Sequence, residues 1–375
     1  MKKLPPLHWT PKIHKSPTGA RFIIGSKKSS LKPLGKAITK IFKVIFHNKR
    51  KYFRKAGFFS GLKQFWCIDS HPEVIATLDR ISNKNKAMSI STYDFSTLYT
   101  KIPHNNLEAA LHSIIDSTFN DTNRKLMAVG NTRAYWVKGN FSTKPKFDKE
   151  TIKTCVSFLI NNAYFHVGKA IFRQIIGIPM GSDPAPFFAN LFLFHYESKW
   201  IKSTSYNNYA RTKKLFNIFR YIDDLIVLND QAEFNNSFNT IYPNEMVLNK
   251  ENIGDQSATF LDLSITIQDN KFDYKLYDKR NAFPFDIVRF PFRSSNLPNK
   301  MFYATIQAEI LRICRATARF NSFIAECNPF LIRMVEQGAQ KNDLKQPIDK
   351  MISRHSREFS KYNFTKKQLV KEILK

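Results

Sequence analysis

Two adjacent aspartates, Asp223 and Asp224, interrupt an apolar run, RYIDDLIVL, whose composition is otherwise typical of a buried strand. A buried carboxylate without a partner costs several kcal/mol or takes up a proton, so such residues are usually paired or bound to a metal. One interpretation is a hairpin whose tip exposes both side chains to water, since Asp is common in turns. The other is a pair of functional carboxylates, and the segment alone leaves both open.

Another aspartate stands in a similar place earlier in the chain. Asp94 lies near the end of a predicted strand within residues 90–100, and a helix with one apolar face follows Pro103. If the two strands are neighbours in one sheet, Asp94 and Asp223 converge and can hold two divalent cations. Two ions about 3.5–4 Å apart stabilise the attacking and the leaving oxygen of an in-line phosphoryl displacement. Mg²⁺ suits this role because it prefers hard oxygen ligands and keeps positions open for phosphate.

The charge of the chain indicates its partner. Lys and Arg number 59 against 30 Asp and Glu, giving a formal net charge of +29, and seventeen Lys and Arg precede the first acidic residue, Asp69. So large a field of one sign repels itself unless a polyanion neutralises it. We therefore expect nucleic acid as the partner, ahead of an anionic membrane surface. A merely soluble basic protein fits the one-sided distribution poorly.

Several other classes of site are not indicated by the sequence. The four cysteines form no C-x-x-C pair and have no histidine at zinc-ligand spacing, which predicts a reducing intracellular compartment rather than a zinc site or a disulfide framework. A P-loop, a G-x-G-x-x-G fingerprint, a signal peptide and a membrane-spanning apolar stretch are also absent. Metal held by carboxylates, together with basic side chains, must then handle any phosphate.

Hydrophobic spacing predicts a basic N-terminal region, a mixed α+β centre and a helical, basic C-terminal region. Predicted helices cover residues 31–55, the segment after Pro103, about 148–162, the segment FFANLFLFHYESKW, and most of the chain from about 296. Hairpins are predicted at YFHVGKAIFRQ and RYIDDLIVL, and short strands within 240–290. Residues 120–150 are polar and predict an insertion or a long loop.

Three segments resemble reverse-transcriptase motifs in the order that this family shows. YIDD resembles the Tyr-x-Asp-Asp box, DFSTLY resembles the palm motif before it, and GIPMGSDPAPFFANLFL resembles the Gly-x-Pro-x-Gly-Ser motif with its helix. A narrower resemblance is to the Penelope-like retroelements, the branch considered closest to telomerase. TPKIHKSPTGARFI and TFLDLSI carry it, and it extends from about Leu4 into the C-terminal helices. Members often have a GIY-YIG endonuclease and additional N-terminal sequence, so we expect a truncated or partial element without that endonuclease.

The resemblance implies an α+β right-hand polymerase. Its expected parts are basic fingers at 1–88, a palm with an antiparallel sheet at 89–290, a fingers insertion around 120–180 and a helical thumb at 291–375. The implied activity is RNA-directed DNA polymerase, which joins dNTPs to a DNA primer 3′-OH on an RNA template. It implies two Mg²⁺ ions, which Mn²⁺ can replace, and action in the nucleus, with the cytoplasm as an alternative. The oligomeric state is left open.

The resemblance also implies roles for single residues. Asp94, Asp223 and Asp224 are the expected catalytic carboxylates and metal ligands, with Asp224 in a supporting position. Tyr99 matches an aromatic gate that abuts the sugar 2′ position and excludes ribonucleotides, and a core tyrosine is the alternative. Lys250 is a candidate general acid for the leaving pyrophosphate, although an ordinary surface lysine fits as well.

Nucleotide binding is expected from the fingers and from the Gly-x-Pro-x-Gly-Ser segment. Lys12 and Arg21 match basic residues that cover the triphosphate, where Arg suits a bidentate contact and Lys a point charge. Met180 replaces the glutamine of many retroviral relatives, so a polar contact is lost there. Gly177 and Gly181 would let the backbone approach template and nucleotide closely. In so basic a region, a solvated charge is the alternative for Lys12 and Arg21.

Primer and duplex contacts are expected nearer the C-terminus. The segment Phe260 to Leu263 matches a hairpin that grips the primer end, and a plain core strand is its alternative. Arg312, Arg315 and Arg319 would track the duplex backbone as part of a thumb, through salt-sensitive contacts that carry no sequence information. A solvated helix face is the alternative for these three arginines.

Two other functions stay open at this point. An RNA-dependent RNA polymerase has a similar palm, but Tyr99 and a YIDD box in place of Gly-Asp-Asp argue against it. A catalytically inactive or domesticated nucleic-acid scaffold is the other alternative. The retained carboxylates argue against a scaffold, because a protein without catalysis has no need for acids that are costly to bury.

Overall fold

The computed structural model describes residues 4–11, 20–138, 142–283, 285 and 287–375. The chain forms two compact units, each built from two separate stretches of sequence. The first unit combines Met1–Asp69 with Tyr93–Glu251, and the second combines Ser70–Thr92 with Asn252–Lys375. This division cuts across the expected fingers, palm and thumb, and the assignment of those three parts stays a prediction.

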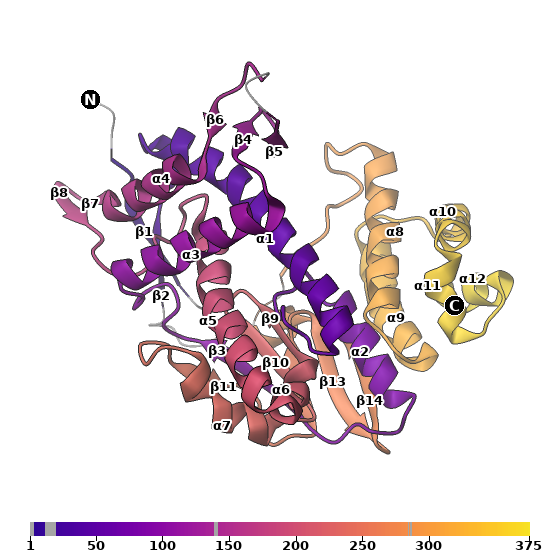
Figure 1. The fold of residues 1–375 in the computed structure, drawn as a ribbon. Coiled ribbons are helices and arrows are strands. Elements are labelled where there is room, and N and C mark those ends of the chain that lie inside the picture. The colour runs from indigo at the N-terminus through magenta and orange to yellow at the C-terminus, as the bar shows by residue number, and fades with distance from the viewer. Residues whose placement is uncertain (1–3, 12–19, 139–141, 284, 286) are drawn as a thin grey trace. The chain divides into compact units, whose positions relative to one another are not determined.

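The helices of the first unit pack against one another around its core (Figure 1). They are α1 (Lys32–Ser60), α3 (His104–Thr122), α4 (Lys149–Asn161), α5 (Ala185–Asn207), α6 (Tyr209–Lys214) and α7 (Gln231–Ile241). In α1 the predicted apolar stripe is buried, and Ile38, Ile41 and Phe42 have no exposed surface. The helix continues past the predicted end at Lys55 until Gly61, whose φ of 67° stops it.

The main sheet of the first unit has four strands in the order β11 (Leu248–Lys250), β3 (Ile90–Phe95), β10 (Asp224–Leu228) and β9 (Ile218–Tyr221). Strands β9 and β10 form an antiparallel hairpin, as the sequence predicted. Because β3 lies directly beside β10, the condition under which Asp94 and Asp223 were expected to converge is met. This sheet places the carboxylates of the candidate site.

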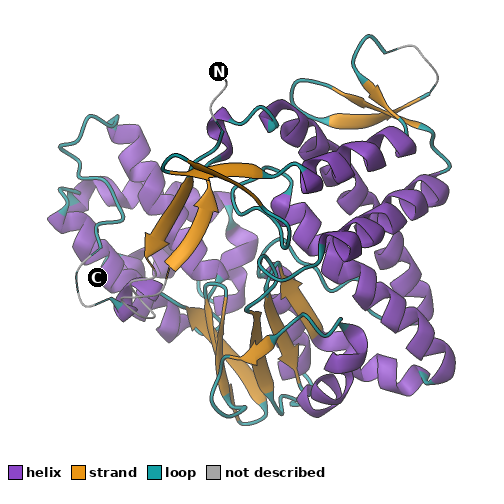
Figure 2. Ribbon diagram, turned by 90° about the vertical axis from the view of Figure 1, so that its left-hand side faces the viewer, coloured by secondary structure: helices purple, strands orange, loops and turns teal. Residues whose placement is uncertain are grey.

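Smaller sheets complete the first unit. Two are hairpins, β1 (Leu7–Pro11) with β2 (Ala20–Ile24), and β7 (Tyr164–Val167) with β8 (Ala170–Arg173). The third, at the upper right of Figure 2, has three strands in the order β5 (Ala134–Val137), β4 (Leu126–Val129) and β6 (Lys146–Phe147).

The three-stranded sheet corrects the prediction of a long loop at residues 120–150, while the alternative of an insertion stays a prediction. Two short apolar runs, LMAV and AYWV, flank a turn within that polar stretch, and Met127 and Ala128 are fully buried. Lys40 of α1 fastens the turn by donating hydrogen bonds to the carbonyl oxygens of Gly130 and Asn131, at 2.9 and 2.8 Å. Packing against α1 therefore outweighs the local polarity of this segment.

The second unit contains a three-stranded antiparallel meander and a group of helices. Its strands are β12 (Ser257–Phe260), β13 (Leu263–Gln268) and β14 (Lys271–Leu276). Its helices are α2 (Pro72–Ser82), α8 (Asn299–Arg315), α9 (Phe320–Glu336), α10 (Lys341–Arg354), α11 (Ser356–Phe359) and α12 (Lys366–Ile373). The helical C-terminal region is confirmed, and residues 316–319 separate α8 from α9. Among the described helices, none is long and apolar enough to cross a membrane.

Candidate active site

Asp94 and Asp223 lie on adjacent elements of the four-stranded sheet. Asp94 is the penultimate residue of β3, and Asp223 lies in the two-residue turn between β9 and β10. The backbone amide of Phe95 donates a hydrogen bond to the carbonyl oxygen of Asp223 at 3.1 Å. Both aspartate side chains are half-buried. The sheet therefore brings together the two residues that the sequence predicted to converge.

The electrostatics of Asp223 reflect this arrangement. Burial raises the pKa of its carboxyl above the ordinary Asp value, and the charge of Asp94 raises it further. The positive charges of Arg21 and Arg220 lower the same pKa. Arg21 is exposed on β2, opposite Thr10. Of the two predicted basic residues of the fingers, Arg21 thus lies within electrostatic range of the carboxylates, and Lys12 lies outside the described residues.

Tyr99 lies in the turns that follow β3 and is half-buried. Burial raises the pKa of its hydroxyl to about 12, and the negative charge of Asp223 contributes to that rise. The phenol is therefore neutral near the carboxylates at physiological pH. Its backbone carbonyl accepts a hydrogen bond from the amide of Ile178 at 2.9 Å, which ties this turn to the Gly-x-Pro-x-Gly-Ser segment.

Gly177 and Gly181 allow close approach to other backbone of this chain. Gly177 has a φ of 79°, and a Cβ there would lie 2.3 Å from the carbonyl oxygen of Tyr99. Gly181 has a φ of 103°, and a Cβ there would lie 2.3 Å from the carbonyl oxygen of Ile24. The amide of Ile24 in turn donates to the carbonyl of Met180 at 2.7 Å. The glycines thus join β2, the turn at Tyr99 and the nucleotide segment, while their approach to template or nucleotide stays a prediction.

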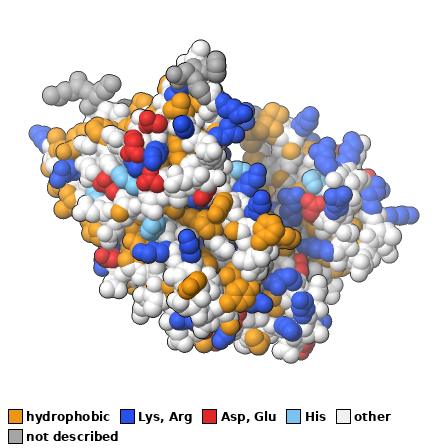
Figure 3. Space-filling model, viewed as in Figure 1, with side chains coloured by type: hydrophobic (Ala, Val, Ile, Leu, Met, Phe, Trp, Pro, Cys, Tyr) orange, Lys and Arg blue, Asp and Glu red, His pale blue; other side chains and the backbone are white. Residues whose placement is uncertain are grey.

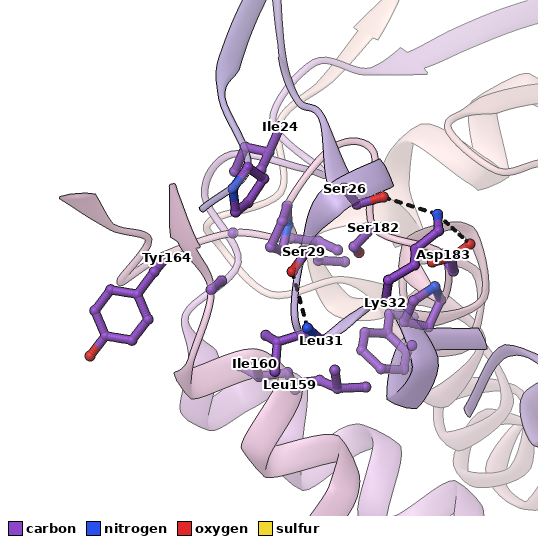
Figure 4. A pocket seen from close by; sticks show the side chains of 18 of the residues that line it. Ile24, Ser26, Ser29, Leu31, Lys32, Leu159, Ile160, Tyr164, Ser182 and Asp183 are labelled. Atoms are coloured by element: carbon purple, nitrogen blue, oxygen red, sulfur yellow. Dashed lines mark hydrogen bonds and ion pairs between the residues drawn. The ribbon is translucent and has the colours of Figure 1, made fainter. Parts of the chain in front are cut away.

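A side-chain cluster that sequence reasoning missed supports the same segment (Figure 4). Lys32 Nζ donates to Asp183 Oδ1 at 2.9 Å and to Ser26 Oγ at 3.2 Å, and Ser26 Oγ donates to the carbonyl of Gly181 at 2.6 Å. Ser26, Lys32 and Asp183 line a mainly apolar cavity between the start of α1, the end of α4 and the segment before α5. The available signal was the position of Asp183 directly after GIPMGS.

The remaining residues predicted for the first unit lie in the same sheet or beside it. Lys250 is exposed on the edge strand β11, opposite Tyr93 of β3, while Asn249 is opposite Asp94. Asp224 begins β10, opposite Tyr221. Their proposed roles as general acid and as a supporting carboxylate stay predictions.

In the second unit, the segment from Phe260 to Leu263 forms the turn between β12 and β13, as predicted. Asp262 Oδ1 lies 2.8 Å from His71 Nδ1, and Asp262 Oδ2 lies 3.1 Å from Arg312 Nη1. The hydrogen bond from His71 holds the pKa of Asp262 below its ordinary value, and the charges of His71 and Arg312 also lower it. The hairpin tip is therefore fastened to α8, and its contact with a primer stays a prediction.

The three arginines predicted to contact the duplex have acidic partners within the second unit. Arg312 Nη2 donates to Glu309 Oε1 at 2.7 Å, and Arg315 Nη2 donates to Glu358 Oε1 at 2.7 Å. Arg319 lies between α8 and α9, with its Nε 3.3 Å from Asp273 Oδ2. These ion pairs give the arginines a role in the folded unit, while contact with nucleic acid stays a prediction.

The carboxylates of the site are donors of the kind that Mg²⁺ prefers. In the part of the chain that the structure describes, no three His, Cys, Asp or Glu side chains are grouped to hold a metal ion by themselves. Mg²⁺ nevertheless needs only one or two protein carboxylates when substrate phosphates and water supply the other oxygens. Asp94 and Asp223 offer such oxygens, and burial together with the nearby charge of Asp94 raises the pKa of Asp223, which a bound cation would oppose. The residues present therefore fit Mg²⁺.

Known proteins were compared with the chain by sequence and by structure. No protein-family model and no curated protein matches the sequence. Among solved structures, telomerase from Candida albicans in complex with the TWJ fragment of telomeric RNA matches with a TM-score of 0.54 and 12% identity, over 99% of this chain and 66% of that chain. Apo telomerase from Candida tropicalis matches with a TM-score of 0.51 and 14% identity, over 99% and 61%.

The fold is similar to that of telomerase. A third structure, telomerase from Candida tropicalis in complex with the TWJ fragment of telomeric RNA, agrees, with a TM-score of 0.50 and 15% identity over 100% of this chain and 61% of that chain. The chain thus spans about two thirds of the length of these telomerase structures or slightly less. At such identities the likeness concerns the fold alone, and the narrower Penelope-like relationship stays a prediction.

Proposed function

We propose that this protein is an RNA-directed DNA polymerase that joins deoxynucleotides to a primer 3′-OH. The convergence of Asp94 and Asp223 on neighbouring strands of a telomerase-like fold carries this proposal. Two carboxylates at the tip of a sheet, with Arg21 in electrostatic range, suit phosphoryl transfer because they can hold cations while the arginine faces the phosphates. The neutral hydroxyl of Tyr99 lies near Asp223, where a nucleotide sugar would be placed.

The residues of the chain divide the work in this proposal. Asp94 and Asp223 would hold Mg²⁺, which supplies activation of the primer hydroxyl and charge stabilisation of the departing pyrophosphate when it is bound. Arg21 binds and orients the triphosphate, and Tyr99 excludes a 2′-hydroxyl by its bulk. Met180 and Gly181 form the wall against which the base and sugar pack, at a position fixed by their hydrogen bonds to Ile24 and Ser26.

Charge and structural likeness support nucleic acid as the partner. The chain has a formal net charge of +29, and Figure 3 shows Lys and Arg spread widely over the face in view, with fewer acidic side chains among them. An RNA template is favoured because telomerase structures that match the chain contain a fragment of telomeric RNA. The Penelope-like resemblance adds a retroelement origin and action in the nucleus to the proposal.

Primer extension on matched templates tests the proposal. A labelled DNA primer is annealed to an RNA template or to a DNA template of the same sequence, and Mg²⁺ is supplied with either dNTPs or rNTPs. We expect extension on the RNA template with dNTPs and little extension with rNTPs. Extension with rNTPs alone would indicate an RNA-dependent RNA polymerase. Tight duplex binding with no extension under any of these conditions would indicate a scaffold.

A further inference from the structure

Arg220 lies at the end of the strand that leads into the turn with Asp223, and its side chain has no exposed surface. An arginine is almost never fully buried unless it is paired, because its charge and its five N–H donors lose the solvation of water. The contacts that replace water around Arg220 therefore show which groups anchor its side chain and which groups the side chain fixes in place.

One part of the guanidinium is anchored in the core. Nε donates to Glu197 Oε1 at 2.5 Å and Nη2 donates to Glu197 Oε2 at 3.1 Å, and Glu197, on α5, is itself 1% exposed. Tyr242 donates its hydroxyl to Glu197 Oε1 at 2.8 Å. Nη2 also donates to the sulfur of Cys67 at 2.9 Å, where burial raises the pKa of the thiol to about 12 and keeps it neutral. Glu197 thus supplies the counter-charge.

The other part of the guanidinium holds the turn. Nη1 donates to the carbonyl oxygen of Ile222 and to Asn190 Oδ1, both at 2.9 Å. Ile222 has a φ of 54°, a conformation that a β-branched residue adopts only under strain. The next carbonyl, that of Asp223, accepts the amide of Phe95 at 3.1 Å. Both carbonyls of the turn are therefore held, one by Arg220 and one by β3.

We propose that Arg220 is a positioning residue that fixes the turn so that Asp223 faces Asp94. The inference rests on the proposed function of this site. A planar guanidinium can donate to Glu197 and to the carbonyl of Ile222 at once, because its donors point in fixed, separate directions. A lysine ammonium is a single point charge. It can keep the ion pair with Glu197 but cannot make all the hydrogen bonds of the guanidinium. Substitution by lysine therefore separates neutralisation of charge from positioning.

Single-turnover primer extension of Arg220→Lys in the full chain tests the proposal. The amplitude of the extension time course measures the fraction of enzyme molecules that are productive. Its rate constant measures how fast each productive enzyme adds a nucleotide. Misplacement of a catalytic group by about 1 Å costs on the order of 100-fold, so we expect a fall of that order in the rate constant at near-normal amplitude. A merely structural role would lower the amplitude and leave the rate constant unchanged, which would overturn the proposal.

Arg211→Lys is the matched control. Arg211 also pairs with a carboxylate in the first unit, because its Nε donates to Glu233 Oε1 at 2.7 Å and its Nη2 donates to Ser237 Oγ at 3.1 Å. Its partners lie on α7 and not in the turn, so we expect its rate constant to equal that of the wild type. A fall in the control as large as that in Arg220→Lys would contradict a specific role for Arg220.

A second variant keeps the proposal testable if Arg220→Lys fails to fold, which circular dichroism would reveal. Asn190→Ala removes the other acceptor of Nη1 and leaves the pair with Glu197 in place, so we expect a smaller fall in the same rate constant. An unchanged rate constant in a folded Asn190→Ala, with Arg220→Lys unfolded, would overturn the proposal.

Mn²⁺ binding without nucleotide gives a readout that is independent of activity. Electron paramagnetic resonance measures free Mn²⁺ in a titration of each protein. We expect weaker Mn²⁺ binding by Arg220→Lys than by the wild type and by Arg211→Lys. If the wild type binds Mn²⁺ but extends no primer, the proposed function fails while a weakened Arg220→Lys still supports positioning. Equal Mn²⁺ affinities in all three proteins would overturn the positioning role.

Discussion

The amide of Phe95 donates a 3.1 Å hydrogen bond to the carbonyl oxygen of Asp223. Phe95 directly follows Asp94, so the main chain next to one carboxylate is tied to the main chain of the other. The spacing of the two acids is thus set by the strand ladder and the turn, before any cation is present. Burial of Asp223 and the nearby charge of Asp94 both disfavour the ionised carboxylate, and this cost leads to the first prediction.

Replacing Asp223 by Asn should stabilise the metal-free protein at neutral pH. Because the pKa of Asp223 is raised, the native state binds its proton more tightly than the unfolded state, and stability falls as pH rises from the ordinary Asp value of 3.8 through the raised pKa. Asparagine removes this loss, and we expect a melting temperature about 1–3 °C above wild type near pH 7.

Thermal melting with a chelator present, at a series of pH values, measures this effect. The advantage of Asp223→Asn should shrink as the pH is lowered through the raised pKa and vanish below the ordinary Asp value of 3.8, where the wild-type carboxyl is protonated in both states. If the variant melts below the wild type at pH 7, the ionised carboxylate of Asp223 is stabilised by its partners. Burial and the charge of Asp94 would then not dominate its free energy.

The two glycines of the nucleotide segment should be far less tolerant of alanine than a third glycine with a similar backbone. Gly168, in the turn between β7 and β8, has a φ of 56°, and a Cβ there would meet no atom within 4 Å, so Gly168→Ala should cost only about 1 kcal/mol. Gly177→Ala and Gly181→Ala add collisions with carbonyl oxygens at 2.3 Å. We expect each to lower the free energy of unfolding by roughly 3 kcal/mol or to prevent folding. Chemical denaturation of all three variants gives the comparison, and equal losses would refute it.

Tyr99→Ala should weaken the discrimination against ribonucleotides. The side chain is half-buried within electrostatic range of Asp223, and in the proposed function its truncation opens space where a 2′-hydroxyl would lie. We expect the ratio of kcat/KM for a dNTP to that for the matching rNTP to fall by roughly 10–100-fold. Tyr99→Phe is the matched control and should keep the ratio, because exclusion depends on bulk. A ratio unchanged in Tyr99→Ala would favour a purely structural tyrosine.

The salt dependence of duplex binding distinguishes two possible roles for Arg315 and Arg319 in the second unit. If each binds a phosphate, alanine at one position should reduce the slope of log Kd against log salt by about 0.7–0.9. If each serves only its ion pair with Glu358 or Asp273, the slope should stay unchanged. We expect the reduced slope for both, since each arginine side chain is at least half exposed. Unchanged slopes in both variants would assign the arginines to folding alone.

Short-range patterns in the sequence predicted the elements that carry the site. The apolar run around two aspartates, a common turn residue, predicted the hairpin around Asp223. Convergence of Asp94 with Asp223 was expected only if their two strands share a sheet. The small sheet at residues 126–147 was not predicted, because burial against α1 overrides the polarity of its surroundings. Local spacing does not reveal such tertiary packing.

The support of the site depends on partners that are distant in sequence. Arg220 contacts Glu197 and Cys67, which lie 23 and 153 residues away, and no local pattern indicates that these side chains meet. Lys32 and Asp183 are likewise 151 residues apart. The close approach of Gly177 to Tyr99 depends on the same three-dimensional arrangement. A single sequence therefore indicated the candidate carboxylates of the site, while the structure was needed to find the groups that support them.

The most direct test of the central claim is incorporation of one dNTP opposite an RNA template by the wild type, Asp94→Asn and Asp223→Asn. Each protein is saturated with duplex, and binding is measured separately in the same buffer with Mg²⁺. The account predicts incorporation by the wild type, with no detectable incorporation by either variant while duplex binding is retained. Incorporation by both variants at the wild-type rate would contradict it, because the two carboxylates would then have no part in the chemistry.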